Sequence, residues 1–154
     1  MGPQGPIFVC GAGRMDSLQG ATARILSIKM DASFTISFEG DHIKVLSDGA
    51  KNLDYAKRLW TAIVEACNEH KCYRVLGIAD TTSPMPPLDG YQHADLFRKL
   101  GITRNYRVAW VELNQEAKEA TYFVETVLFN RGLPGRLFDS VADATEWLLT
   151  EDNT

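Results

Sequence analysis

A polar segment in the middle of the chain carries the side chains best suited to chemistry. Residues 80–83 place one carboxylate and three hydroxyls directly after the apolar run 75–79. Such groups can hydrogen-bond a ligand, accept a phosphate group, satisfy loop backbone or cap a helix that begins near Leu88 or Asp89. Polar residues also follow the later apolar runs, at Glu112, Asn114 and Asp139. The predicted ligand or partner surface comprises Asp80, Thr81, Thr82, Ser83, Tyr91 and Glu112.

Two other clusters are weaker candidates for binding chemistry. Cys67, His70 and Cys72 resemble part of a zinc site, but the chain has no second Cys/His cluster to complete a tetrahedral set. The alternative interpretation is a helix end with a buried thiol. Gly11 and Gly13 resemble a dinucleotide-binding turn, yet Asp16 occupies the third glycine position. We therefore expect no metal and no cofactor.

The sequence also lacks the usual context of a catalytic nucleophile. Its three histidines are His42, His70 and His93, and no Gly-x-Ser-x-Gly motif accompanies them. Without a nucleophile and a base that can be paired, no catalytic residue is predicted, and we expect a protein that is not an enzyme.

The elements that position these residues follow from hydrophobic periodicity. Residues 34–38 and 42–46 alternate like half-buried strands around a turn at 40–41, which predicts an antiparallel hairpin. Asn52 is placed to cap a helix whose apolar residues recur at helical spacing as far as Cys67. Residues 75–79 and 108–111 are short continuous apolar runs, typical of strands buried on both faces.

The second half of the chain continues the alternation of strand and helix. Helices are predicted from near Leu88 to the stop at Gly101, from Asn114 to Gly132, and after Ser140, with a minimal strand at 136–138 between the last two. The order ββαβαβαβα predicts an α/β fold: a mostly parallel open sheet with an N-terminal antiparallel hairpin and helices on both faces. Met85 and Tyr91 could line an apolar pocket beside the Pro-rich segment 83–87.

Length and composition set the remaining limits. The 154 residues, 45% of them hydrophobic, suit one domain, here 33–150, with a flexible leader at 1–32 and a flexible tail at 151–154. Met30 is a candidate natural start of translation. A formal net charge of −4 argues against nucleic acid as a partner. The apolar run near the start is too short for a signal peptide or a membrane span, and with three cysteines we expect a cytoplasmic protein without stable membrane insertion.

The segment 36–149 resembles the SpoIIAA-like family of small bacterial proteins, whose fold is related to STAS domains and to the lipid-binding CRAL-TRIO domain. The resemblance is carried by four stretches of framework: 73–80, 106–111, 123–132 and 141–148. In STAS relatives a Ser or Thr that follows an Asp at the end of a central strand is phosphorylated by a partner kinase. The resemblance implies Thr81, Thr82 and Ser83 as the matching positions.

Two functions are compatible with these observations. The first is a non-enzymatic regulatory or interaction module of STAS-like type that presents the segment from Asp80 to Asp89 and the following helix to an unknown protein partner. The alternative is a carrier for a small apolar, lipid-like or anionic ligand in the crevice beyond the strands. An exposed edge strand in the hairpin also makes a homodimer a candidate assembly.

Overall fold

The computed structural model describes residues 29–30, 34–83 and 85–150 of the chain. Six strands form one sheet in the order β2-β3-β4-β5-β6-β7. The strands are β2 (Lys29–Met30), β3 (Phe34–Phe38), β4 (Ile43–Ala50), β5 (Arg74–Ser83), β6 (Arg107–Glu112) and β7 (Arg136–Phe138). The helices are α2 (Leu53–His70), α3 (Pro87–Leu100), α4 (Lys118–Asn130) and α5 (Val141–Leu149), with a single 3-10 turn, η1 (Gln115–Ala117), leading into α4.

The predicted α/β architecture is confirmed. β3 and β4 form the antiparallel hairpin, and β4, β5, β6 and β7 run parallel to one another. One boundary differs: Lys29 and Met30 lie inside the segment predicted as a flexible leader, but they pair with Ile36 and Thr35 as an antiparallel edge strand. Apart from Lys29 and Met30, the predicted leader lies outside the described residues. The predicted tail at 151–154 also lies outside them.

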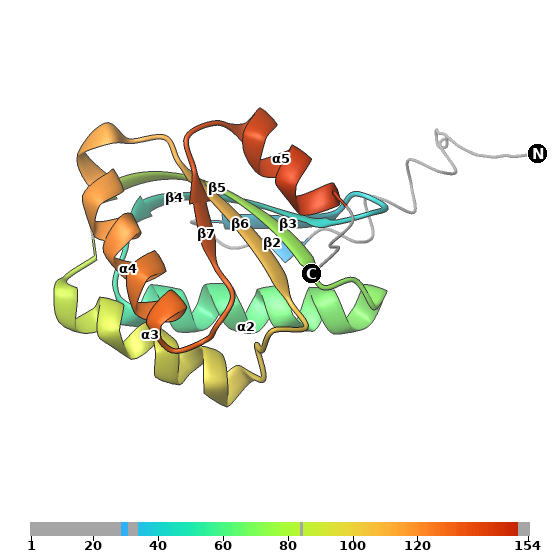
Figure 1. Ribbon diagram of the computed structural model, residues 1–154, viewed down its shortest axis with the longest axis horizontal. Coiled ribbons are helices and arrows are strands. Elements are labelled where there is room, and N and C mark those ends of the chain that lie inside the picture. Colours follow the sequence, from blue (N-terminus) through green and yellow to red (C-terminus); the bar gives the residue numbers. More distant parts are fainter. Residues whose placement is uncertain (1–28, 31–33, 84, 151–154) are drawn as a thin grey trace, which may run out of the picture.

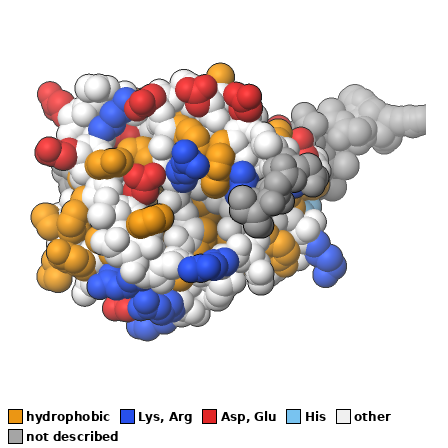
Figure 2. Space-filling view, viewed as in Figure 1, with side chains coloured by type: hydrophobic (Ala, Val, Ile, Leu, Met, Phe, Trp, Pro, Cys, Tyr) orange, Lys and Arg blue, Asp and Glu red, His pale blue; other side chains and the backbone are white. Residues whose placement is uncertain are grey.

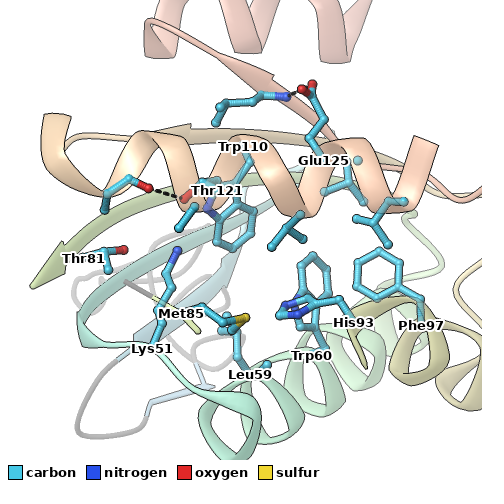
Figure 3. A pocket seen from close by; sticks show the side chains of 18 of the residues that line it. Lys51, Leu59, Trp60, Thr81, Met85, His93, Phe97, Trp110, Thr121 and Glu125 are labelled. Carbon is cyan, nitrogen blue, oxygen red and sulfur yellow. Dashed lines mark hydrogen bonds between the residues drawn. The ribbon is translucent and has the colours of Figure 1, made fainter. Parts of the chain in front are cut away.

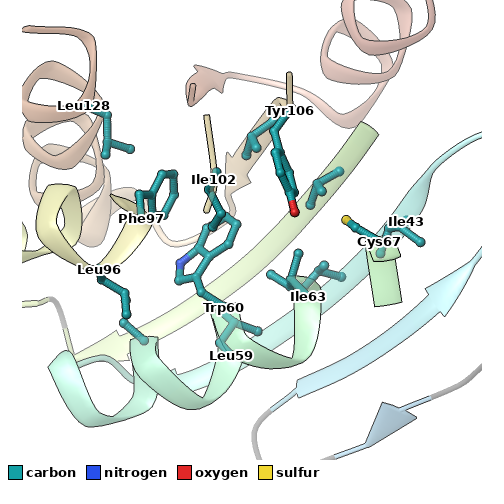
Figure 4. Close-up of a cluster of buried hydrophobic side chains, with 14 of the residues drawn as sticks. Ile43, Leu59, Trp60, Ile63, Cys67, Leu96, Phe97, Ile102, Tyr106 and Leu128 are labelled. Carbon is teal, nitrogen blue, oxygen red and sulfur yellow. The ribbon is translucent and has the colours of Figure 1, made fainter. Parts of the chain in front are cut away.

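The helices divide unequally between the two faces of the sheet (Figure 1). α2, α3 and α4 cover one face, and α5 covers the other, where Ala144 and Leu148 pack against Leu76, Ala109 and Val111. The larger core lies under the three-helix layer (Figure 4), in which Trp60, Ile63, Phe97 and Ile102 are buried between the helices and the sheet. Of the apolar residues predicted to line the buried side of α2, Leu53 and Val64 are only partly buried; the others are buried, namely Ala56, Leu59, Trp60, Ile63 and Cys67.

Side-chain caps fix two of the helix starts that the sequence predicts. Asn52 Oδ1 accepts a hydrogen bond of 2.8 Å from Tyr55 N at the start of α2, and Ser140 Oγ accepts one of 3.1 Å from Asp143 N at the start of α5. The start of α3 does not fit the alternative interpretation in which residues 80–83 cap it. Pro86 is its N-cap, no side chain caps it, and Pro87 occupies the first turn, where a missing N–H has no cost.

The strand β5 is longer than the apolar run at 75–79 predicts. It continues to Ser83 because β4 continues beside it: Asp48 pairs with Asp80, Gly49 with Thr81, and Lys51 N donates to Ser83 O at 3.0 Å. The hydroxyl residues therefore belong to a strand end, and their alternating side chains point to opposite faces. Thr81 is buried, whereas Asp80 and Thr82 are exposed.

A glycine in β5 makes room for the aromatic ring that the site below uses. Gly77 pairs with Trp110 of β6, and a Cβ on Gly77 would lie 2.0 Å from the Trp110 ring. The ring therefore lies across the backbone of β5, on the face covered by α2, and its centroid is 5.5 Å from that of Trp60. Close approach to a neighbouring side chain is what requires glycine at this position.

Candidate functional site

A buried carboxylate at the end of β6 collects the polar groups that surround it. Glu112 is fully buried, and its side chain accepts hydrogen bonds from Thr81 Oγ1 at 2.6 Å, Thr81 N at 2.9 Å and Asn114 N at 3.2 Å. Thr121 Oγ1 of α4 lies 3.4 Å from Oε1. Asn114 also donates from Nδ2 to Thr81 O, so β5, β6 and the start of the α4 segment are joined around one ionised group.

Lys51 is the cation that faces this carboxylate. It follows β4 directly, its side chain is 13% exposed, and its Nζ lies 3.3 Å from Glu112 Oε1 and 5.5 Å from the centroid of the Trp110 ring. An ammonium group has three N–H donors. Glu112 takes one of them, and no other oxygen or nitrogen acceptor of the described residues contacts Nζ. The amine therefore retains capacity to donate to a ligand.

The surroundings shift the pKa values of both partners. Burial lowers the pKa of Lys51, and attraction to Glu112 offsets this only in part. Burial by itself raises the pKa of Glu112, but the hydrogen bonds from Thr81, the charge of Lys51 and the bond from Asn114 N together outweigh it and lower that pKa. The site thus holds the carboxylate ionised and makes the charged amine less favourable than in water.

A mostly apolar pocket of about 80 Å³ extends from Lys51 between the sheet and the helices α2, α3 and α4 (Figure 3). Lys51 and Thr81 lie at one end, and Met85, His93, Trp60 and Phe97 form its helix side. Small side chains at Ala117 and Ala120 leave space below α4. At its other end the pocket reaches residues 135–137, which lie at the start of the edge strand β7. These three residues are partly or fully exposed.

His93 adds a second polar group to the wall of this pocket. Its Nδ1 lies 3.2 Å from Asp89 O one turn earlier in α3, and burial lowers its pKa, a backbone hydrogen bond offsetting this only in part. Because a carbonyl accepts hydrogen bonds, the neutral ring carries its proton on Nδ1 and keeps Nε2 as an acceptor. The pocket therefore combines the Lys51 amine and the His93 Nε2 acceptor with the N–H groups of Trp60, Trp110 and Arg136, in a lining that is otherwise mostly apolar.

The predicted site residues separate into three groups. Thr81 and Glu112 are brought together, and Asn114 joins them. Asp80, Thr82 and Ser83 are exposed and lie outside the pocket. Tyr91 is also exposed and outside the pocket, and its ring packs edge-on against Phe123. Asp139 forms a surface ion pair with Lys118 at 3.5 Å. Of the pocket residues suggested beside the Pro-rich segment, Met85 lines it and Tyr91 does not.

Two findings bear on modification and metal binding. The Thr81 hydroxyl is buried and bonded to Glu112, so of the three predicted phosphorylation positions only Thr82 and Ser83 present exposed hydroxyl residues. Burial raises the pKa of the Cys67 thiol to about 12, which disfavours a thiolate ligand there. In the described part of the chain no three His, Cys, Asp or Glu side chains are grouped to hold a metal.

Sequence reasoning missed Lys51, His93 and the pocket itself. Lys51 is 61 residues from Glu112 in the chain, and nothing in its local pattern distinguishes it from a surface lysine that precedes a helix cap. A signal for His93 did exist, because it falls three residues before the apolar Leu96 and four before Phe97 on the predicted helix and therefore on its buried face.

Comparisons with known proteins give one fold neighbour. No family model and no curated protein matches the chain. A solved structure that is similar is an uncharacterized protein of the DUF3478 family with a SpoIIAA-like fold from Shewanella loihica PV-4, at 15% identity and a TM-score of 0.47. The match covers 78% of this chain and 99% of that one. Among the described helices, none has the length and apolar character needed to cross a membrane.

The buried network predicts a specific dependence of stability on pH. We expect Glu112→Gln to lower the free energy of unfolding by about 3 kcal/mol at neutral pH, because it leaves Lys51 without its counter-charge. Since the fold lowers the pKa of Glu112, its contribution is complete above the ordinary glutamate pKa of about 4.3 and is lost as the pH falls through the lowered value. Urea unfolding of the unmodified protein and of Glu112→Gln at a series of pH values measures the difference between their free energies of unfolding. This difference should be constant from about pH 7 to 5 and become smaller below that range.

The matched control is Glu116→Gln, which changes an exposed carboxylate four residues further along the chain. It should leave the unfolding free energy nearly unchanged at every pH. A loss of the same size for both variants, or a difference for Glu112→Gln that does not narrow in acid, would contradict the assignment of Glu112 as the centre of the network.

Proposed function

We propose that this protein is a non-enzymatic binding module that holds a small, mostly apolar molecule in the pocket between the sheet and the three-helix layer. The observation that carries the proposal is the Lys51 amine at the end of an apolar pocket, with Glu112 as its one polar partner among the described residues. A buried donor without a full set of acceptors has a free-energy cost that a ligand oxygen would remove. The surrounding apolar walls favour a ligand that is otherwise hydrocarbon.

The charges around the pocket favour an uncharged ligand head. Lys51 and Glu112 neutralise one another, and His93, whose pKa is lowered by burial, adds no positive charge at neutral pH. A carboxylate ligand at this end of the pocket would bring a second negative charge beside Glu112, with Lys51 as the one nearby cation to balance both. A hydroxyl or carbonyl oxygen would instead accept from Lys51 without changing the net charge of the site.

The volume of the pocket limits the size of the ligand. At about 80 Å³ it suits a short chain or a small ring and not a long lipid, unless side chains move. The partly exposed residues 135–137 give the direction from which a ligand would enter, since β7 is the edge of the sheet and its one described strand neighbour is β6. Glu125 of α4 accepts a hydrogen bond of 2.7 Å from Leu137 N and so defines the rim of that entrance.

The absence of an enzyme mechanism remains part of this proposal. Glu112 is committed to at least four donors, and the Thr81 hydroxyl donates to it, so neither group is placed to attack a substrate. His93 is held by Asp89 O and is backed by Phe97, with no hydroxyl or thiol nucleophile bonded to its ring in the described residues. These contacts support binding more than turnover.

Hexanol and hexanoate, which differ in the charge of the head group, test the proposal. We expect hexanol to raise the thermal unfolding midpoint and to alter tryptophan fluorescence through Trp60 and Trp110, and hexanoate to have a much smaller effect. Lys51→Met should weaken hexanol binding by about tenfold through loss of its hydrogen bond. Ala120→Leu, which fills the pocket and leaves Lys51 in place, should abolish binding.

Lys118→Met is the matched control, because Lys118 is also paired with a carboxylate but lies outside the pocket. It should bind hexanol like the unmodified protein. Equal binding by Ala120→Leu, or a preference for hexanoate, would contradict the proposed site.

An interaction module is the second candidate function, and exposed apolar residues near the start of α3 favour it. Leu88 is 66% exposed and Tyr91 is 50% exposed on α3, and Tyr122 of α4 is 61% exposed. Figure 2 shows hydrophobic side chains gathered on this side of the molecule, over the start of α3. Thr82 and Ser83 lie a few residues before this helix, so phosphate there would add about 1.5 to 2 negative charges close to the apolar surface.

A pull-down with the purified protein tests this second candidate. A partner captured by the unmodified protein should be lost with Tyr91→Ser and weakened by Ser83→Glu, since the first removes apolar contact area and the second adds charge. Phe129→Ser, which changes an exposed aromatic residue at the other end of α4, is the control and should retain the partner. Retention by all three variants would remove this surface as the docking site.

A further inference from the structure

A second hollow lies at the opposite end of the strands from Glu112 and is lined by four arginines. This groove has a volume of about 700 Å³ and runs across the amino-terminal ends of β5, β6 and β7. Its lining contains Arg74, Arg104, Arg107 and Arg136, and no described carboxylate belongs to it. The remaining wall is polar amide, glycine and aromatic surface that includes Tyr73, Tyr106, Phe129 and Trp147.

The strand register explains why three of the arginines converge. Arg74, Arg107 and Arg136 are the first residues of three adjacent parallel strands (Figure 1), and Arg74 pairs directly with Arg107. Arg136 pairs with Ala109, two residues after Arg107, so all three side chains start from the same face of the sheet. This is the α5 face, because Arg107 lies 3.9 Å from the centroid of the Trp147 ring.

Contacts hold three of these arginines in place, and those of Arg104 and Arg136 leave the charge unneutralised. Arg104 Nε donates to Gly132 O at 3.2 Å, and Arg107 donates to Trp147 O from Nε at 3.2 Å and from Nη2 at 2.8 Å. Arg136 lies over the rings of Phe138 and Trp147. Carbonyl and ring partners orient a guanidinium group but do not remove its positive charge. The side chain of Arg74 forms no hydrogen bond or ion pair with any described residue.

Such an arrangement is costly unless an anion meets it. Neighbouring like charges repel, and this chain has a formal net charge of −4. The charges of Arg74, Arg104 and Arg136, with no described carboxylate in the lining, are therefore a strong local departure from the average of the chain. A guanidinium group can bind two phosphate oxygens through two parallel hydrogen bonds. A groove lined by several arginines is therefore suited to bind a phosphate group.

We infer that this groove is a binding site for a phosphate-bearing small molecule of about nucleotide size. Arg74 and Arg104 would contact the phosphate oxygens, with Arg136 adding positive potential, and the exposed ring of Phe129 gives an apolar surface for the rest of the ligand. The volume of the groove lies within the range usual for small-molecule sites. A long polyanion is disfavoured, because beyond the groove it would meet a protein surface with an acidic excess.

The two arginines that would contact the phosphate do not line the pocket of the proposed function. The two linings share Val108, Gly135 and Arg136, whereas Arg74 and Arg104 line the groove alone. Substitutions at Arg74 and Arg104 therefore test the groove without altering the apolar pocket, and hexanol binding by the same variants reports whether that pocket is intact.

Titration calorimetry with the full chain tests the inference with pyrophosphate, adenosine triphosphate and a short DNA duplex. We expect saturable binding of the two small phosphates at one site. Arg74→Gln and Arg104→Gln should each weaken it by about tenfold, as the loss of a charge-assisted hydrogen bond predicts. Arg98→Gln removes an exposed arginine that is paired with Asp95 on α3, and it should leave the affinity unchanged.

Each outcome decides between specific alternatives. Tighter binding of adenosine triphosphate than of pyrophosphate supports a contribution from the aromatic wall, and equal affinity supports recognition of phosphates alone. No binding of either small molecule, an equal loss with Arg98→Gln, or preferential binding of the duplex would overturn the inference. Unchanged hexanol binding in the arginine variants shows that any loss is local to the groove.

Discussion

The ionised carboxylate of Glu112, buried at the end of β6, is the interaction on which the candidate site depends. It holds Thr81 of β5, Asn114 before η1 and Lys51 after β4 around one pair of oxygens. A buried charge is tolerated when hydrogen bonds and a counter-charge replace its water, and here both are present. The same bonds set the position of Lys51, and through it the polar end of the apolar pocket.

Two hollows of opposite character lie toward the two ends of the parallel strands, and the apolar pocket extends from its polar end along the sheet as far as the start of β7. At the carboxyl ends, the pocket combines apolar walls with a pair of charges that cancel, which suits an uncharged molecule. At the amino ends, the groove combines four arginines with aromatic residues, which suits an anion. The general expectation that ligands bind beyond the carboxyl ends of strands in open α/β sheets points to the first and would overlook the second.

The sequence predicted the framework well, because local patterns determine it. Periodicity located the hairpin, the buried strands and the apolar stripe of α2, and the caps at Asn52 and Ser140 were recognisable from residue type and position. The length of β5 was underestimated, because its last residues are polar and are kept in the strand by pairing with β4 and not by their own preference.

The site was predicted only in part, for a physical reason. Thr81 and Glu112 were chosen as polar residues at strand ends, and the parallel register brings them together. Lys51 and His93 come from elements whose packing a single sequence does not specify, so their place at one pocket could not be inferred. The arginines were visible at the start of three apolar runs, but their convergence depends on the order of strands in the sheet.

The most direct test of the pairing between Lys51 and Glu112 is to titrate the lysine amines of the full chain and to monitor each one by NMR of labelled lysine side chains. Burial beside Glu112 predicts that Lys51 titrates at lower pH than the exposed lysines, and that Glu112→Gln lowers its pKa further, because the attraction that partly offsets burial is removed. A Lys51 that titrates together with the exposed lysines, or one that does not respond to Glu112→Gln, would contradict the account.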